Sequence, residues 1–106
     1  MPSSARKRVV ILGSTGSIGR AALEVAAADP GSFEVVGLSA HRSIELLAEQ
    51  ARRHGVARVA LAGDDAPRGA FDPGVDVGVG PEAVVALAEA PEADLVVNAL
   101  VGSAGL

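Results

Sequence analysis

One stretch decides the fold of this chain: Val9-Val10-Ile11-Leu12-Gly13-Ser14-Thr15-Gly16-Ser17-Ile18-Gly19. Its first four residues form an unbroken apolar run, which is typical of a strand buried on both faces of a parallel sheet. The glycines that follow are spaced as G-x-x-G-x-x-G and permit a tight turn. Apolar residues at helical spacing come next, so the stretch predicts a strand, a glycine-rich turn and a helix.

The rest of the chain continues this alternation of strands and helices. The first helix is predicted to end at Asp29-Pro30-Gly31, and its apolar residues are Ile18, Ala21, Ala22, Val25 and Ala26. Further strands are predicted at residues 33–38, 56–61 and 95–100, with a short edge strand within 75–79. The strand at 95–100 is expected to be buried. A second helix begins after Ser43, which is expected to cap it, and ends at Gly55. A third begins at Pro81 and ends before Pro91, with Val84, Val85, Leu87 and Ala88 turned inward.

Strands that alternate with helices at these intervals predict an α/β fold with right-handed crossovers, namely a Rossmann-like doubly wound parallel sheet. We expect residues 1–106 to form one domain. The last residues, Gly105 and Leu106, follow a glycine-containing turn at which such a fold normally starts another helix. We therefore expect the sheet to be incomplete at its carboxyl end.

The composition excludes several classes of protein. The formal net charge is -4, and the only basic run is Arg6-Lys7-Arg8, so neither a nucleic acid nor a membrane surface is an expected partner. No apolar stretch approaches the length of a membrane span, and the default expectation is a cytoplasmic protein. The chain has no cysteine and only two histidines, His41 and His54, which is too few for a histidine-based metal site without help from carboxylates. His54 is expected to be a surface residue that caps the end of the second helix.

The glycine turn is a candidate phosphate-binding site. Gly13 and Gly16 allow a close approach of the backbone, Thr15 and Ser17 offer hydroxyl groups, and Ile18 begins the helix whose free amides favour a pyrophosphate. A plain structural turn is the alternative, but it would need one flexible residue rather than three glycines and two hydroxyls. The Gly-Lys-Ser/Thr ending of a Walker loop and the Gly-x-Ser-x-Gly nucleophile elbow are both missing.

The residues after the second strand indicate which nicotinamide cofactor is used. An acidic residue there would bind the ribose 2′-hydroxyl of NAD, but this sequence has Ser39-Ala40-His41-Arg42-Ser43. The guanidinium of Arg42 and the hydroxyl of Ser43 suit a 2′-phosphate instead, which favours NADP. The alternative is that Arg42 is an ordinary solvated loop residue.

The string from Ile11 to Gly19 resembles the opening cofactor turn of the 1-deoxy-D-xylulose 5-phosphate reductoisomerases. Residues 30–50 resemble the second strand and helix of that family, and residues 98–106 its later Val-Gly-x-Ala-Gly-Leu segment. The resemblance implies that this chain is the amino-terminal, NADPH-binding part of such an enzyme. The implied cofactor positions are Thr15, Gly16, Ser17, Ile18, His41, Arg42 and Ser43. His41 departs from the glycine common in the family, and Ser43 from an asparagine.

In that family, NADPH and a divalent metal, Mg or Mn, serve the conversion of the phosphosugar 1-deoxy-D-xylulose 5-phosphate to 2-C-methyl-D-erythritol 4-phosphate in isoprenoid biosynthesis. Members are several times longer, and the resemblance implies a homodimer whose metal ligands lie outside this chain. We therefore assign no catalytic residue, and we expect the chain alone to be inactive. Two alternatives stay open: another Rossmann reductase, such as a semialdehyde dehydrogenase, and a non-enzymatic nucleotide-binding module complete at 106 residues.

Overall fold

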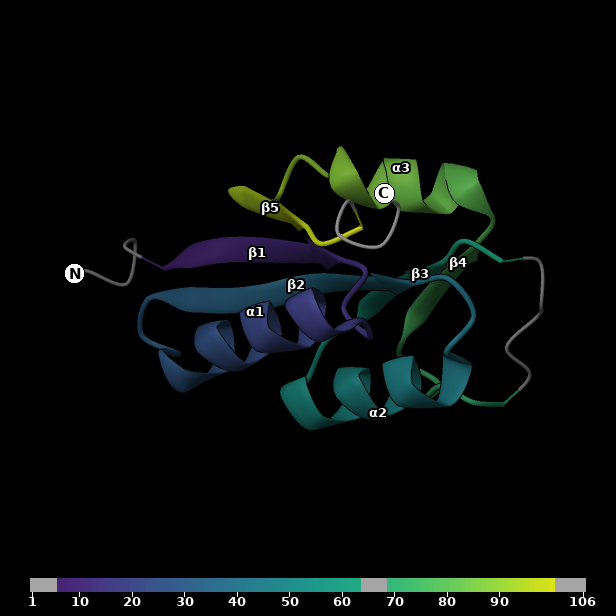
Figure 1. Ribbon diagram of the computed structural model, residues 1–106, viewed down its shortest axis with the longest axis horizontal. Helices are drawn as coiled ribbons and strands as arrows, with labels where there is room; N and C mark the ends of the chain where they lie inside the picture. The colour runs from purple at the N-terminus through teal and green to yellow at the C-terminus, as the bar shows by residue number, and fades with distance from the viewer. Residues whose placement is uncertain (1–5, 64–68, 101–106) are drawn as a thin grey trace.

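The computed structural model describes residues 6–63 and 69–100, which form a parallel sheet with helices on both faces (Figure 1). The strands are β1 (Lys7–Leu12), β2 (Phe33–Ala40), β3 (Arg58–Leu61), β4 (Asp76–Val79) and β5 (Leu95–Asn98). The helices are α1 (Ser17–Ala28), α2 (Ile44–His54) and α3 (Pro81–Ala88). Among these residues the strand order is β4-β3-β2-β1-β5, and every neighbouring pair is parallel. The prediction of a Rossmann-like α/β fold is confirmed.

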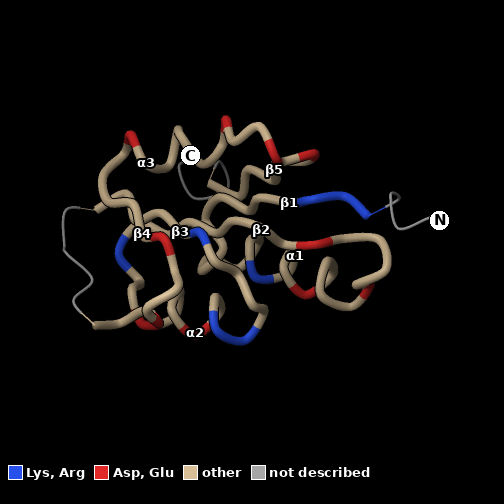
Figure 2. Tube along the Cα trace, turned by 180° about the vertical axis from the view of Figure 1, so that it is seen from behind, with Lys and Arg blue, Asp and Glu red and all other residues tan. Residues whose placement is uncertain are grey.

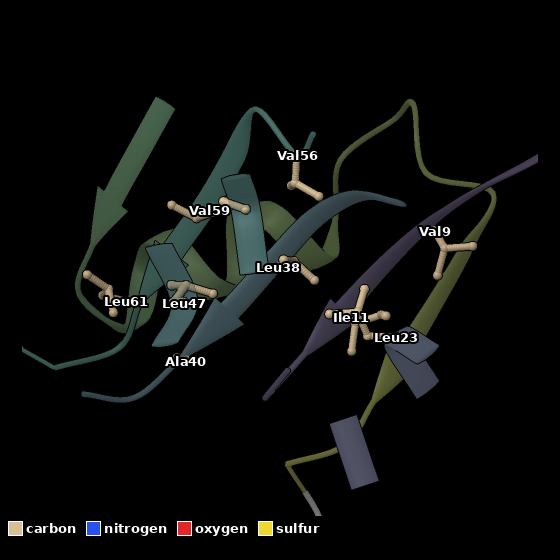
Figure 3. Packing of buried hydrophobic residues seen from close by; sticks show 10 residues of the cluster. Val9, Ile11, Leu23, Leu38, Ala40, Leu47, Val56, Val59 and Leu61 are labelled. Carbon is tan, nitrogen blue, oxygen red and sulfur yellow. The ribbon is translucent and has the colours of Figure 1, made fainter. Parts of the chain in front are cut away.

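The sheet separates two apolar layers because consecutive residues of β1 point to opposite faces. Val9 and Ile11 face the layer beneath α1 and α2, whereas Val10 and Leu12 face Leu87 of α3. Figure 1 shows α1 and α2 on one side of the sheet and α3 on the other. Figure 3 shows the larger layer, whose buried members are Val9, Ile11, Leu23, Leu38, Ala40, Leu47, Ala51, Val56, Val59 and Leu61.

The pairing of β1 with β2 is irregular at one position. Val9 pairs with Val35, but Val10 pairs with Gly37, so Val36 is an extra residue in β2. Val36 packs in the layer beneath α3, and a Cβ built at Gly37 would meet Leu87 on that same side. Leu38 and Ala40 consequently return to the layer beneath α1 and α2.

The order of the strands reverses next to β1, and this reversal positions the site. From β1 the chain proceeds outward through β2 and β3 to β4, and α3 then carries it back across the sheet to β5 on the other side of β1. The helices that follow β1 and precede β5 lie on opposite faces, so the carboxyl ends of these two strands border a crevice. Ligands of open α/β sheets bind at such a point.

The prediction that Val85 of α3 turns inward is wrong, and two of the apolar residues at helical spacing in α1 are also exposed. Ile18 and Val25 of α1 are 55% and 66% exposed, because the helix approaches the sheet through Gly19 and buries Leu23 and Ala26 instead. In α3, Val85 is 54% exposed, since the helix turns Leu87 toward the sheet.

Four predicted strands have different bounds in the structure. β1 begins at Lys7 rather than Val9, and β2 ends at Ala40 rather than residue 38. The strand expected from residue 56 begins at Arg58, because the Val56 amide donates to the Ala51 carbonyl oxygen (2.9 Å) and so terminates α2. The strand expected to reach residue 100 ends at Asn98. It was also expected to be buried, but Leu95 and Val96 are 44% and 40% exposed, since among the described residues β5 pairs with β1 alone.

Candidate functional site

The turn between β1 and α1 is built on a left-handed residue. Gly13 has φ +77°, a conformation that favours glycine, and its carbonyl oxygen accepts a hydrogen bond from the Gly16 amide at 3.2 Å. Gly19 then brings α1 directly against this turn. A Cβ at position 19 would overlap the Gly13 carbonyl oxygen and stand 2.7 Å from the Cα of Ser14. Glycine is therefore required by the fold at both positions.

Gly16 differs from the other two glycines because no residue that the structure describes crowds it. Its φ is -80°, which any residue adopts, and the nearest atom to a Cβ built there is the Gly13 carbonyl oxygen at 3.7 Å. The fold alone would accept a methyl group at this position. A glycine here leaves the backbone open to a ligand, as a phosphate group requires.

The amino terminus of α1 points its free amides at this opening. Gly16 is the N-cap residue and supplies no side-chain hydrogen bond, and the first turn contains no acidic residue. The first amides of a helix have no intrahelical acceptor, and the helix dipole makes this end positive. The geometry suits an anion such as a pyrophosphate.

A hollow of about 340 Å³ lies beside this helix terminus, at the crevice between the carboxyl ends of β1 and β5. The turn contributes most of its lining, and the segments after β2 and β5 supply the remainder: Gly13, Thr15, Gly16, Ser17, Ile18, His41, Ala99 and Leu100. Six of the eight residues predicted to bind a cofactor are thus brought together. The exposure of Ile18 also has a reason, since its side chain borders the hollow rather than the core.

The other two predicted residues, Arg42 and Ser43, lie next to His41 but do not line the hollow. Both are exposed, and a Cβ built at Gly63 would stand 3.2 Å from the Cγ of Arg42. Within residues 6–63 and 69–100, no hydrogen bond or ion pair holds the Arg42 guanidinium. The guanidinium is therefore available to a ligand at the edge of the site.

Ser43 does not cap α2 in the expected way. It is the N-cap residue, but its ψ of 71° is not the extended value usual at this position, and its side chain makes no capping hydrogen bond. Ser43 is joined to the first turn of α2 through its backbone instead, since the Leu47 amide donates a hydrogen bond to the Ser43 carbonyl oxygen at 2.9 Å.

Sequence reasoning missed a buried polar network behind the turn. Ser14, Ser39 and Gln50 are 0%, 1% and 7% exposed, and they come from the turn, the end of β2 and α2. The Ser14 hydroxyl donates to Gln50 Oε1 at 2.7 Å, and Gln50 Nε2 donates to the Ser14 carbonyl oxygen at 2.9 Å. One signal was present in the sequence: Gln50 is polar on a helical face that it shares with Leu47 and Ala51.

Charged residues of both signs are spread over the molecule rather than gathered around the hollow (Figure 2). His54, expected to be a surface residue at the end of α2, is half-buried. Burial, and secondly the charge of Arg53, lower its pKa below the usual 6.5. In the described part of the chain, no three His, Cys, Asp or Glu side chains are grouped to hold a metal, and no helix has the length and apolarity to cross a membrane.

The sequence is similar to that of known enzymes over most of its length. The family model of 1-deoxy-D-xylulose 5-phosphate reductoisomerase matches residues 9–106. The reductoisomerase of Rhodococcus jostii is 54% identical over 100 residues, covering 93% of this chain and 25% of the relative. That of Mycolicibacterium smegmatis is 55% identical over 102 residues, covering 95% of this chain and 25% of the relative. The chain therefore spans about a quarter of the length of the curated relatives that it matches.

Solved structures agree with this similarity. The reductoisomerase from Zymomonas mobilis in complex with NADPH has a TM-score of 0.77 and 28% identity, over 86% of this chain and 25% of the other. A reductoisomerase in complex with magnesium has a TM-score of 0.81 and 25% identity, over 95% of this chain and 26% of the other. The turn, the crevice and these similarities agree, and the chain belongs to the 1-deoxy-D-xylulose 5-phosphate reductoisomerase family.

Proposed function

We propose that this chain forms the NADPH-binding part of an enzyme that converts 1-deoxy-D-xylulose 5-phosphate to 2-C-methyl-D-erythritol 4-phosphate. One observation carries the proposal: Gly16 has space for a side chain within the fold, yet it lies in the lining of a hollow at the amino terminus of α1. A glycine that the fold does not need is explained by a ligand that must approach the backbone. The similar reductoisomerase of Zymomonas mobilis was solved in complex with NADPH, which supports NADPH as this ligand.

The pyrophosphate of NADPH would lie against the turn. Gly13 gives the turn its shape, Gly16 admits the phosphates to the backbone, and Thr15 and Ser17 offer hydroxyl donors. Ile18 and His41 supply the walls of the hollow, and Ala99 and Leu100 lie across the crevice, where the nicotinamide end would extend.

Arg42 and Ser43 would hold the 2′-phosphate that distinguishes NADPH from NADH. Both are exposed beside His41, and the Arg42 guanidinium has no ion pair with any residue that the structure describes. No acidic residue lies between Ser39 and Ser43, so nothing there would repel a phosphate or bind a free 2′-hydroxyl. A guanidinium next to a phosphate forms charge-assisted hydrogen bonds.

NADPH supplies a hydride when bound, and the role of this chain is to bind and orient it. We assign no catalytic residue to the chain. The divalent metal, Mg or Mn, is proposed to be held by residues outside the chain, and the phosphosugar with it. We further propose that the complete protein is cytoplasmic, which the lack of cysteine in this chain permits, and that it is a homodimer, as the resemblance to the family implies.

The proposal is tested by titrating NADPH into the complete protein by calorimetry, and by following NADPH oxidation with 1-deoxy-D-xylulose 5-phosphate and Mg²⁺. We expect binding with one site per chain and turnover in the complete protein, but no turnover by residues 1–106 alone. Absence of NADPH binding would refute the cofactor site. Binding without turnover in the complete protein would favour the alternative of a nucleotide-binding module.

A further inference from the structure

The network of Ser14, Ser39 and Gln50 fixes one side of the glycine turn inside the protein. All three residues are more than nine-tenths buried, and no buried side-chain nitrogen or oxygen in the described residues lacks a partner. The turn's first two amides are both bound to the end of β2. The Gly13 amide donates to Ser39 Oγ at 3.0 Å, and the Ser14 amide to the Ser39 carbonyl oxygen at 2.8 Å.

Gln50 makes the contact between this turn and α2. The Ser14 carbonyl oxygen can only accept, so it must face the Nε2 group of Gln50, at 2.9 Å. The Oε1 atom then faces the Ser14 hydroxyl, which donates to it at 2.7 Å. A side chain with one donor and one acceptor in this arrangement matches both partners, and neither a carboxylate nor an apolar side chain does so.

These bonds divide the turn into two parts. The amides of Gly13 and Ser14 are directed inward and are already paired, and the Gly16 amide is bound to the Gly13 carbonyl oxygen. Thr15, Ser17 and Ile18 line the hollow. Rotation of Ser14 out of the protein would move Thr15 with it, since the two are joined through one peptide bond. The orientation of the phosphate-binding residues therefore depends on what holds Ser14.

We propose that Gln50 is a positioning residue for the dinucleotide: through Ser14 it holds the turn in the form that presents Thr15, Ser17 and Ile18 to the phosphates. This inference rests on the proposed function of the turn as an NADPH site. Gln50 does not line the hollow itself, and it acts only through Ser14. Because α2 starts directly after Arg42 and Ser43, the same helix connects the turn with the residues proposed for the 2′-phosphate.

The first test replaces Gln50 by methionine, which has a similar length and neither a hydrogen-bond donor nor a strong acceptor. In the complete protein, Gln50→Met should raise the dissociation constant and the KM of NADPH by about tenfold, the effect of losing one or two buried hydrogen bonds. The kcat at saturating NADPH should stay as in the wild type, because a correctly bound cofactor is unchanged.

A matched control separates positioning from stability. Leu47 is fully buried on the same helix, and its apolar side chain forms no hydrogen bond with Ser14, so Leu47→Val weakens packing and leaves the network intact. This variant should melt at a lower temperature and bind NADPH as the wild type does. Equal weakening of NADPH binding in both variants would overturn the proposal, and so would unchanged binding in Gln50→Met.

A second variant keeps the shape of the Gln50 side chain. Its test compares cofactor affinities at several pH values, so it does not depend on comparing the folding stabilities of different variants. In Gln50→Glu, the protonated carboxyl donates to the Ser14 carbonyl oxygen and accepts from its hydroxyl, which restores both bonds. The ionised carboxylate can only accept, and it adds a negative charge behind the phosphates. The dissociation constant of NADP⁺, divided by the wild-type value at the same pH, should therefore fall about tenfold from about pH 8 to about pH 5.5.

Titration of the neighbouring groups cancels in this ratio. The charged and titratable residues that border the same groove as Gln50 are present in both proteins: Arg20, Glu24, Glu49, Arg53 and His54. A ratio that does not change with pH would overturn the positioning role while the wild type still binds NADP⁺. Failure of the wild type itself to bind NADPH would instead overturn the proposed function, so the two failures are distinguishable.

Discussion

Gly19 lies so close to Gly13 that a methyl group at position 19 would overlap the Gly13 carbonyl oxygen and stand 2.8 Å from its carbonyl carbon. Both neighbours are backbone atoms, so no side chain can move to relieve the overlap. Gly16, three residues earlier, has no such neighbour. The glycines of one turn therefore have different roles, which substitution by alanine separates.

Gly19→Ala is predicted to destabilise the fold by about 3 kcal/mol or more, because α1 must move away from the turn to admit the methyl group. Urea unfolding of the variant and the wild type measures this difference. Gly16→Ala is the control and should change the free energy of unfolding by less than about 1 kcal/mol. Similar losses in the two variants would contradict the distinction.

Gly16→Ala is predicted to abolish most NADPH binding while the fold is retained. The added methyl group would project from the lining of the hollow, at the point where the phosphates are proposed to approach the backbone. We expect the dissociation constant of NADPH to rise by at least about tenfold, measured by calorimetry, with an unchanged circular dichroism spectrum. Wild-type affinity in this variant would mean that the phosphates do not contact Gly16.

Arg42→Ala is predicted to weaken NADPH binding by roughly ten- to hundredfold, the equivalent of about 1.5–3 kcal/mol, and to leave NADH binding nearly unchanged. The loss of a charge-assisted bond to the 2′-phosphate is the reason. Arg42→Asp should narrow or invert the preference, since a carboxylate repels the phosphate and accepts a bond from a free 2′-hydroxyl.

Arg53→Ala is the matched control for Arg42, because Arg53 lies near the other end of α2 and does not line the hollow. It removes the same charge and should not change the preference between the two cofactors. Equal losses for NADPH and NADH in Arg42→Ala would assign Arg42 to holding the loop, and selectivity would then be sought at His41 or Ser43.

His54 is predicted to make the stability of the fold depend on pH. Its pKa is lowered, firstly by burial and secondly by Arg53, so the unfolded chain binds this proton more readily than the folded protein. The contribution of neutral His54 to the free energy of unfolding is fully present above the usual pKa of 6.5. It decreases as the pH falls through the lowered pKa of the folded protein. His54→Gln should reduce the difference in unfolding free energy between about pH 7.5 and about pH 5. An identical pH profile in the variant would contradict this.

The sequence alone predicts those parts of the fold that are determined by neighbouring residues. The strand at Val9–Leu12, the glycine turn and the helix after it follow from a local apolar run and from glycine chemistry, and the structure has all three. The exposure of Leu95 and Val96 was not predictable in this way. Their burial depends on which strands flank β5, and this is a long-range property of the sheet.

Two further features required knowledge of partners that are distant in the sequence. Alternation counted from Val35 would place Gly37 beneath α1, but the extra residue in the pairing with β1 places Leu38 there instead. The contact of Ser14 with Gln50 joins residues 36 positions apart, and the contact with Ser39 joins residues 25 positions apart. Polar residues at these places are visible in the sequence, but their pairing follows only from the three-dimensional arrangement.

The place of β5 at the edge of the sheet also affects how often this strand opens. Among the described residues it is bound on one side only, through β1, yet Ala99 and Leu100 at its end form a wall of the hollow. A strand held on one side opens more often than one held on both, so in residues 1–106 alone the amides of β5 should exchange with deuterium faster than those of β1. A dinucleotide that lies across the crevice would bind only the closed form and would slow this exchange. The cofactor would then order the wall against which it rests.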